Sequence, residues 1–313
     1  MNRFCVAALI AAGAAAVDSV TCAPNSHSVG ALPYWTTEQT QPCSYAGTLP
    51  SNAEETHHLF YWLYPAVDAN APLIIWINGG PGASSMFGNF LEMGPMRITR
   101  PNGGTDDNDF LVYLDENNWT TLGHFMAIDQ PVGTGFSWGE PLLTNMEETA
   151  NEWVYFLEQV FAMYPEFVGK DLYFTGESYG GKYLPAYSYA MLMHNVNNPD
   201  FFGLKGTLCG DPYTAPVTQR LSMAIVPEAL NIIDESNMPQ VAAIQRRCLV
   251  NLTNRNMTDA EKGDICASLI NYIADVSGDV FGYNTQIFAQ DWDPIEQVVT
   301  DYFTISGQVQ QIY

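Results

Sequence analysis

The chain has 313 residues, of which 47% are hydrophobic and 14% are charged, so it can bury a large core and is not intrinsically disordered. Its 34 acidic residues outnumber 11 basic ones, giving a net charge of −23. This charge argues against nucleic acid and anionic membrane surfaces as partners, because their phosphates would be repelled. It suits an acidic compartment, although improved solubility explains it equally well.

The first 16 residues have the pattern of a secretory signal peptide. Arg3 supplies a positive start, Phe4 to Ala16 is an apolar run of thirteen residues, and Ala14 to Ala16 offers a typical cleavage site. This run is shorter than the roughly 20 residues of a membrane-spanning helix, and no later stretch is long and apolar enough. We therefore expect an exported chain with no integral membrane segment.

Short strands follow along the chain. His57 to Tyr64 (HHLFYWLY) and Leu73 to Ile77 (LIIWI) are aromatic and β-branched, and a Pro/Asn/Asp turn separates them. The second is apolar throughout, as is typical of a strand covered on both faces. His124 to Asp129, Asp171 to Thr175 and Leu204 to Gly210 are further predicted strands.

A helix is predicted between the third and fourth of these strands. Thr144 and Glu147 have the spacing of a capping box. Apolar residues then recur at helical spacing, namely Ala150, Trp153, Val154, Leu157, Val160 and Phe161. Strands alternating with helices predict an α/β fold, with a mostly parallel sheet and helices on both faces.

The pattern changes after about Pro216. Residues 216–290 are mostly helical in pattern and show little parallel-sheet character, so we expect a helical cap insertion over the sheet. Residues 17–215 would form the N-terminal part of the main domain. Residues 291–313 would begin the return to it.

Cysteine usage agrees with export. Without the signal peptide the chain keeps five cysteines, so at least one has no partner: Cys22, Cys43, Cys209, Cys248 and Cys266. Cys248 and Cys266 flank a polar, Asn-rich stretch and are the first expectation for a disulfide, with Cys22 and Cys43 the second.

Three glycosylation sequons begin at Asn118, Asn251 and Asn256. Such sequons are common by chance. Two of them lie between Cys248 and Cys266, which favours an exposed, extracytoplasmic loop there.

Residues Gly176 to Gly180 (GESYG) fit the pattern G-x-S-x-G. The pattern alone is weak, but a predicted strand precedes it, and Lys182 to Met193 can continue as a helix with Pro185 in its first turns. Strand, tight turn and helix are what a nucleophile elbow requires, with Ser178 projecting above the sheet at a helix N-terminus. The alternative is a glycine-rich turn without chemistry.

A second glycine-rich segment, Asn78 to Gly82 (NGGPG), directly follows the strand Leu73 to Ile77. Glycines leave backbone N–H groups accessible, so this loop could donate hydrogen bonds to an oxyanion formed at Ser178. The alternative is an ordinary Gly-Pro turn.

Four blocks of sequence resemble the serine carboxypeptidase family, which has the α/β-hydrolase fold. They are Trp76 to Ser85 (WINGGPGASS), Leu91 to Pro95 (LEMGP), Asp129 to Ser137 (DQPVGTGFS) and Gly176 to Gly181 (GESYGG). Gly206 to Pro216 (GTLCGDPYTAP) is a looser fifth. The blocks occur in the family's order, and the likeness runs from about residue 41 to 216 and continues faintly beyond.

The resemblance implies a role for several residues. Ser178 would attack the scissile carbonyl to form an acyl-enzyme, and the backbone N–H groups of Gly80 and Tyr179 would form the oxyanion hole. The terminal carboxylate of the peptide substrate would be held by Trp76, Asn78, Glu92 and Glu177. The implied partners are peptide or protein C-termini, no cofactor is implied, and no cluster of residues has metal-ligand spacing.

A carboxylate that binds beside glutamates is repelled unless a proton is shared between the groups. The resemblance therefore implies substrate binding that weakens above neutral pH. Taken alone, Glu92 or Glu177 would be an ordinary solvated carboxylate.

The rest of a catalytic triad is not recognisable in the sequence. A hydrolase of this fold needs an acid and a histidine after the serine, and the only histidine there is His194. It lies sixteen residues on, about 24 Å along a helix. His57, His58 and His124 precede the serine and are typical of structural residues.

The family's Asp and His lie in a C-terminal segment, so this chain is expected to lack part of the sheet. The family often has cysteine at the position of Ala83, so that bridge is absent here. Pairing of Cys43 or Cys209 with a residue beyond position 313 would explain the odd number of cysteines.

The sequence therefore predicts a serine-type carboxypeptidase of the secretory pathway, secreted or in a lysosome-like or vacuole-like compartment, in a form expected to be inactive. Two alternatives remain. One is a non-catalytic peptide-binding protein that keeps the carboxylate site, and the other is an acyltransferase of the same family.

Overall fold

The computed structural model describes residues 20–36, 38–101, 109–288 and 295–305. The predicted signal peptide lies outside the described residues, as do 289–294 and 306–313 of the predicted cap end and return segment. The 3-10 helices η2 (Trp119–Thr121) and η3 (Pro165–Phe167) lie in connections.

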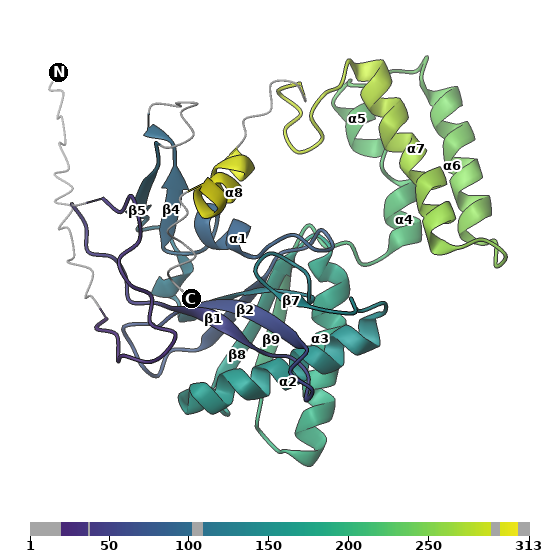
Figure 1. The fold of residues 1–313 in the computed structure, drawn as a ribbon. Helices are drawn as coiled ribbons and strands as arrows, with labels where there is room; N and C mark the ends of the chain where they lie inside the picture. The colour runs from purple at the N-terminus through teal and green to yellow at the C-terminus, as the bar shows by residue number, and fades with distance from the viewer. Residues whose placement is uncertain (1–19, 37, 102–108, 289–294, 306–313) are drawn as a thin grey trace, which may run out of the picture.

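A mixed β-sheet forms the centre of the described fold (Figure 1). Its strand order is β1 (Tyr45–Pro50), β2 (His57–Tyr64), β6 (His124–Asp129), β3 (Leu73–Ile77), β8 (Asp171–Glu177) and β9 (Gly203–Gly210), and β7 (Trp138–Gly139) pairs with β2. The predicted parallel pairing holds from β6 to β9. Strands β1, β6 and β7 pair antiparallel with β2, and the short connection between β1 and β2 allows only that direction.

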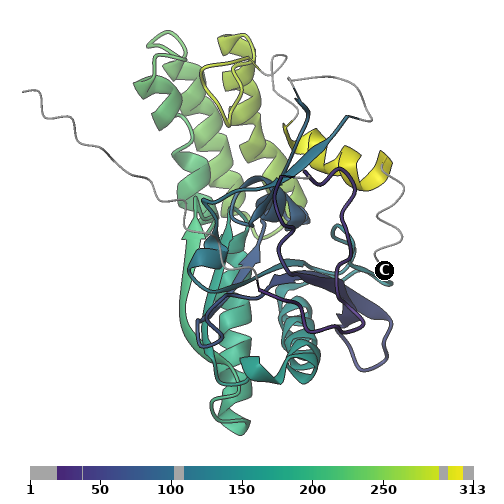
Figure 2. The same ribbon diagram turned by 90° about the vertical axis from the view of Figure 1, so that its left-hand side faces the viewer.

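Layers cover both faces of the sheet because alternate side chains point to opposite sides. Leu63 and Ile75 belong to the core under α2 (Met146–Met163) and α3 (Gly180–Asn197). Trp62 and Ile74 belong to the core on the other face. That face carries α1 (Met86–Leu91), α8 (Ile295–Ile305) and the hairpin of β4 (Met96–Thr99) and β5 (Leu111–Leu114) (Figures 1 and 2).

Helix α2 begins one residue later than its predicted cap. Asn145 is the N-cap, and its side chain accepts a hydrogen bond from the Glu148 N–H at 2.9 Å. The Thr144 N–H donates to the Glu148 carboxylate at 3.0 Å. The predicted Thr144–Glu147 box was wrong by one position, because two capping residues and two glutamates are adjacent and both registers satisfy the spacing.

The predicted cap region contains a separate group of helices, at the upper right of Figure 1. It comprises α4 (Pro216–Leu221), α5 (Ile225–Ala229), α6 (Met238–Leu252) and α7 (Asp259–Ser277). These helices have their own small core, which includes Val241, Ile244 and Leu269. The Cys248–Cys266 disulfide joins α6 to α7.

The second expected disulfide, Cys22–Cys43, is also present and ties the N-terminal segment to the chain just before β1. The possibility that Cys43 pairs with a residue beyond position 313 is therefore wrong. Cys209 on β9 is a free cysteine. Burial, with smaller contributions from the nearby Asp211 and Glu177 carboxylates, raises its pKa to about 11, so it is a poor nucleophile at neutral pH.

Helix α3 is apolar on both sides. Its inner side packs into the core under the sheet. Its outer side carries a row of exposed side chains at helical spacing, with exposed fractions of 65% for Tyr189, 49% for Leu192, 45% for Met193 and 68% for Val196. No helix among the described residues has the length and apolar character that a membrane span requires.

Candidate active site

Ser178 lies in a tight turn between β8 and α3. Its φ of +51° is in the left-handed region, which costs a non-glycine residue of order 1–3 kcal/mol unless the surroundings enforce it. Here the Ser178 N–H donates to Gly210 O at 3.1 Å, and the Ser178 carbonyl accepts from Gly181 N at 3.0 Å and Tyr213 N at 2.8 Å. The neighbouring strand and the start of α3 thus hold the serine in the geometry of a nucleophile elbow.

The glycine-rich loop after β3 packs directly on this turn. A Cβ on Gly79 would lie 2.5 Å from Tyr179 N, 2.8 Å from Glu177 O and 2.8 Å from Ser178 Cβ. Only glycine fits at such a distance. Gly80, with φ +104°, follows in a conformation that side chains rarely adopt. The two segments predicted separately from the sequence are therefore in contact.

A hydrogen-bonded chain links three of the predicted carboxylate-binding residues. Trp76 Nε1 donates to Asn78 Oδ1 at 2.7 Å, and Asn78 Nδ2 donates to Glu177 Oε1 at 2.8 Å. The Gly88 N–H also donates to Asn78 Oδ1 at 3.2 Å, which fixes the amide orientation. Asn78 is buried at 2% exposure, so the Glu177 carboxylate is held beside Ser178 by a pre-organised donor.

A cavity of about 830 Å³ lies beside Ser178. Ser178, Asn78, Gly80, Glu92 and Glu177 lie on its wall, so the structure brings together most of the predicted site. Trp76 lies behind Asn78, and Tyr179 caps the start of α3. Asp211, which follows β9, is a further acidic residue on the wall.

Asp129 supports the loop after β3 and the loop after β6, and it was not predicted as a site residue. It ends β6 and is fully buried. Its Oδ1 accepts from Ser84 Oγ and Ser85 N, each at 2.7 Å, and its Oδ2 accepts from Phe136 N at 2.9 Å. Burial, outweighing these donors, raises the pKa of Asp129 to about 6. The signal in the sequence was a carboxylate at the end of a predicted strand, directly before a glycine-rich block.

This carboxyl should make stability depend on pH. Its pKa is about 6 in the folded chain against 3.8 in the unfolded chain, so the folded state binds the proton more tightly. Protonated Asp129 therefore stabilises the folded state most below pH 4. This stabilisation falls by about 3 kcal/mol in total as the pH rises to about 6, and it is absent at higher pH. We expect the D129N variant to be less stable at low pH but to lack this decline, measured by urea unfolding at pH 4, 5, 6 and 7. The matched change at exposed Asp68, D68N, should retain the decline, and an unchanged slope in D129N would contradict the assignment.

The cavity contains no histidine, although the structure describes all five in the chain. His194 pairs with Glu158 at 2.9 Å, on the far part of α3 from Ser178. The other four have partners elsewhere: His27 with Tyr61, His57 with Glu152, His58 stacked on Trp138, and His124 with the Ala66 N–H.

The sequons differ in accessibility. Asn256 is exposed in the turn between α6 and α7. Asn118 and Asn251 are half-buried, and their side-chain amides donate to Asp115 O and Arg247 O. Asn256 is therefore the sequon whose amide is best placed for modification, which remains a prediction.

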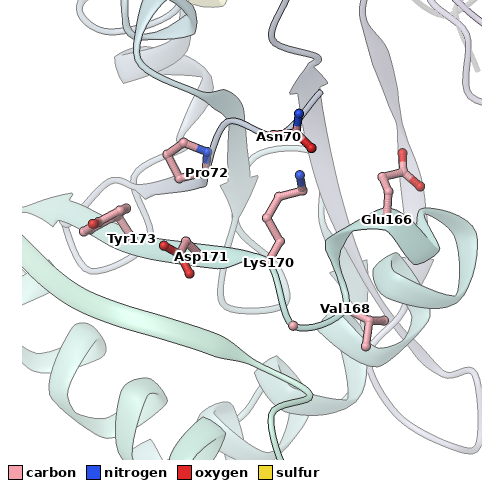
Figure 3. Close-up of a pocket in the computed structure, with 8 residues that line it drawn as sticks. Asn70, Pro72, Glu166, Val168, Lys170, Asp171 and Tyr173 are labelled. Carbon is pink, nitrogen blue, oxygen red and sulfur yellow. The ribbon is translucent and has the colours of Figure 1, made fainter. Parts of the chain in front are cut away.

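A second cavity, of about 540 Å³, lies at the opposite end of β8 (Figure 3). Its wall includes Asn70, Glu166, Lys170 and Asp171. The Lys170 ammonium donates to Ala69 O at 2.7 Å, and no serine or cysteine lines the cavity. Within the described residues, no three His, Cys, Asp or Glu side chains gather as metal ligands would.

Comparison with known proteins finds carboxypeptidases both by family model and by individual relatives. The family model for serine carboxypeptidases matches residues 33–301. The chain is 33% identical over 282 residues to a probable serine carboxypeptidase CPVL of Rattus norvegicus, which covers 86% of this chain and 56% of the relative. It is 39% identical over 181 residues to a vitellogenic carboxypeptidase of Aedes aegypti, covering 56% of this chain and 36% of the relative.

The fold agrees with a solved structure as well. The crystal structure of a prohormone-processing carboxypeptidase, KEX1(delta)p of Saccharomyces cerevisiae, superposes with a TM-score of 0.78 at 27% identity, covering 92% of this chain and 68% of that one. The predicted α/β-hydrolase fold is thereby confirmed. The chain spans only 36% to 56% of the length of the two curated relatives named above. The elbow, the glycine loop and an acid-lined cavity lie in one place, and the family model matches most of the chain's length. The chain therefore belongs to the serine carboxypeptidase family.

Proposed function

We propose that this chain binds the free C-terminus of a peptide in the cavity beside Ser178, as the substrate of a serine carboxypeptidase. The main support is a series of two hydrogen bonds that runs from Trp76 through Asn78 to Glu177, the residue directly before Ser178. Glu92 adds a second carboxyl group to the same wall. These groups are suited to share a proton with a substrate carboxylate.

In the complete reaction, the Ser178 hydroxyl would attack the last peptide carbonyl while a base removes its proton. The C–N bond would break, the proton would pass to the leaving amine, and water would later release the acyl group. The N–H groups of Gly80 and Tyr179, the latter at the start of α3, would stabilise the oxyanion. Because none of the five histidines lines the cavity, we propose that this chain binds peptides but hydrolyses them slowly.

Binding should depend on a free carboxylate and on acid. We expect a peptide acid to bind more than about tenfold tighter than the same peptide amide at pH 5, and the difference to shrink at pH 8, where no proton remains to be shared. The E177Q variant, which mimics the protonated side chain, should bind the acid with a flatter pH dependence. Isothermal titration of both peptides measures this.

The E166Q variant is the matched control, since Glu166 lines the second cavity. Equal affinity for acid and amide at pH 5 would contradict the proposed carboxylate site. Hydrolysis of the acid, followed in the same samples, separates the alternatives. Binding without turnover supports a peptide-binding protein, turnover at an ordinary enzyme's rate contradicts the expected inactivity, and acyl transfer to an added alcohol supports an acyltransferase.

We also propose that the protein enters the secretory pathway, to be secreted or delivered to an acidic lysosome-like or vacuole-like compartment. The two disulfides support this, since such bonds persist in oxidising compartments. The excess of acidic residues and the raised pKa of Asp129 are consistent with an acidic environment.

A further inference from the structure

The backbone leaves α1 through a turn that begins at Glu92 and runs to Pro95. Glu92 is the C-cap of this short helix, and it lies on the wall of the cavity beside Ser178. Of the four residues of the turn, only Glu92 is among those that line this cavity. Carbonyl groups that follow a helix end have no partner within the helix, so those of the turn need hydrogen-bond donors from elsewhere.

Arg97 supplies the donors for two of these carbonyls. It lies on β4, and its guanidinium donates through Nη2 to Glu92 O and through Nη1 to Gly94 O, each at 2.5 Å. Nη1 also donates to Met96 O at 3.3 Å, and Nε pairs with Asp115 Oδ2 at 3.1 Å. The side chain of Arg97 is only 11% exposed. A planar fork of N–H donors can make all these contacts at once, whereas a lysine ammonium is a single point charge.

The other two carbonyls of the turn have backbone partners. Met93 O accepts from Trp119 N at 2.9 Å, and Pro95 O accepts from Asp115 N at 2.8 Å. All four carbonyls of the turn are thus satisfied. Loss of the guanidinium would remove the charged donor from two of them, one of which belongs to the residue on the cavity wall.

The role of Arg97 differs from that of the residues that line the cavity. Arg97 is not among them, so it can act on a bound peptide only through Glu92. Its contact with Glu92 O sets where the backbone of this residue lies, and hence how far the Glu92 carboxyl group is from that of Glu177. Carboxyl groups share a proton with a substrate carboxylate only at hydrogen-bond distance, so a small displacement of one of them weakens binding.

We propose that Arg97 is a positioning residue for binding of the C-terminal carboxylate, and that it acts by holding Glu92 in place on the cavity wall. This inference rests on the proposed function, since that function gives the Glu92 carboxyl group its role. Without the guanidinium, the turn would shift to find other donors for its carbonyls. The Glu92 side chain would then leave the position in which it meets the substrate.

The test measures the ratio of the affinities for a peptide acid and for its amide. The probes are fluorescein-labelled trialanine in the two forms, followed by fluorescence anisotropy at pH 5. We expect R97M, which keeps the aliphatic bulk but no donor, to lower this ratio about tenfold through weaker binding of the acid, with the amide unchanged. R97K keeps the charge, so it should fold even if R97M does not, and it should lower the ratio about threefold. An unchanged ratio in R97K would overturn the inference.

A double-mutant cycle separates positioning from a general loss of structure. The E92A background has no carboxyl group to position, so adding R97M or R97K there should leave the remaining ratio unchanged. V112A is the matched control, because it truncates a fully buried side chain of the same hairpin and should lower stability but not the ratio. An equal fall in the ratio with and without E92A, or the same fall in V112A, would mean that Arg97 acts only through the fold.

The parent protein separates failure of this inference from failure of the proposed function. If the parent binds acid and amide alike, the proposed function is wrong and this inference fails with it. If the parent prefers the acid and the two Arg97 variants keep that preference in full, the proposed function stands and only this inference is wrong.

Discussion

The G79A variant is expected to lose the binding site. The added methyl group would lie 2.5 Å from Tyr179 N and 2.8 Å from Glu177 O, and both are backbone atoms that cannot rotate away. The loop must therefore separate from the elbow, which takes Asn78 away from Glu177. We expect the free energy of unfolding to fall by about 2–3 kcal/mol and peptide affinity to fall at least about tenfold, measured by urea unfolding and titration calorimetry.

The G210A variant is the matched control. A Cβ on Gly210 would meet only Glu177 Cβ at 3.9 Å, an ordinary contact, although this glycine also accepts the hydrogen bond from Ser178 N through its carbonyl. We expect its stability to stay within about 0.5 kcal/mol of the parent and its affinity to be unchanged. Similar behaviour of the two variants would show that the loop and the elbow are not in close contact.

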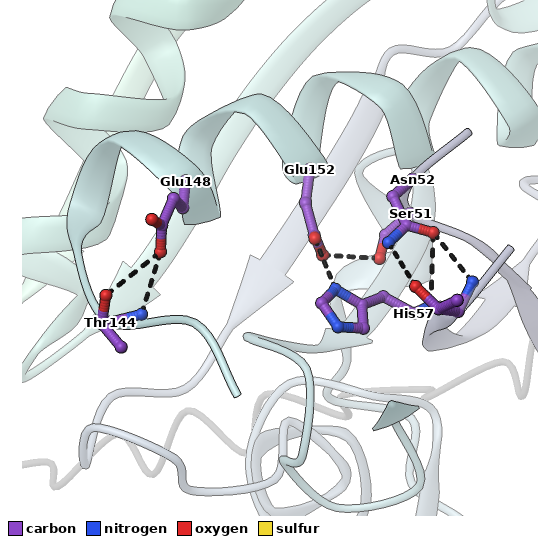
Figure 4. Close-up of polar contacts among 7 residues, drawn as sticks. Ser51, Asn52, His57, Thr144, Glu148 and Glu152 are labelled. Atoms are coloured by element: carbon purple, nitrogen blue, oxygen red, sulfur yellow. Dashed lines mark hydrogen bonds and ion pairs between the residues drawn. The ribbon is translucent and has the colours of Figure 1, made fainter. Parts of the chain in front are cut away.

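The second large effect is expected from Glu152, which joins α2 to the start of β2 (Figure 4). Its carboxylate contacts His57 Nδ1 at 2.5 Å and accepts from Ser51 Oγ at 2.8 Å. Both partners are buried, at 5% and 0% exposure. The E152A variant leaves two buried polar atoms without a partner, so we expect a loss of about 3 kcal/mol in the free energy of unfolding, measured by urea denaturation.

Glu148 provides the control one helical turn earlier. It is a solvent-exposed carboxylate that accepts from the Thr144 N–H at the start of α2 (Figure 4). The E148A variant should lose only part of a helix cap and be much less affected than E152A. An equal loss in the two variants would mean that burial of the Glu152 contacts does not matter.

The elbow and the glycine loop could be predicted because their chemistry is local. Glycine is required where a backbone approaches closely, and a predicted strand of five residues directly precedes each segment. The contact between Gly79 and Tyr179 follows from both segments lying at the carboxyl ends of neighbouring parallel strands. The pattern of residues alone is therefore enough to expect Ser178 and Asn78 in one place.

Other parts depend on contacts that spacing does not reveal. Asp129 accepts from backbone groups of two different loops, and its place at the end of a predicted strand does not by itself show that it is buried. The packing of α8 depends on Phe303 meeting Phe90, which lies more than 200 positions earlier. The hairpin of β4 and β5 was missed because strands of four residues give too short an alternation to recognise.

The outer row of α3, from Tyr189 to Val196, has a consequence for the life of the protein in a cell. Four large side chains on successive turns are exposed to solvent over roughly half of their area or more, on the helix that directly follows Ser178. In a crowded cell, an exposed apolar row on a folded helix is a site of association with other proteins. Such contacts, made through the helix that positions Ser178, would lower the amount of free protein.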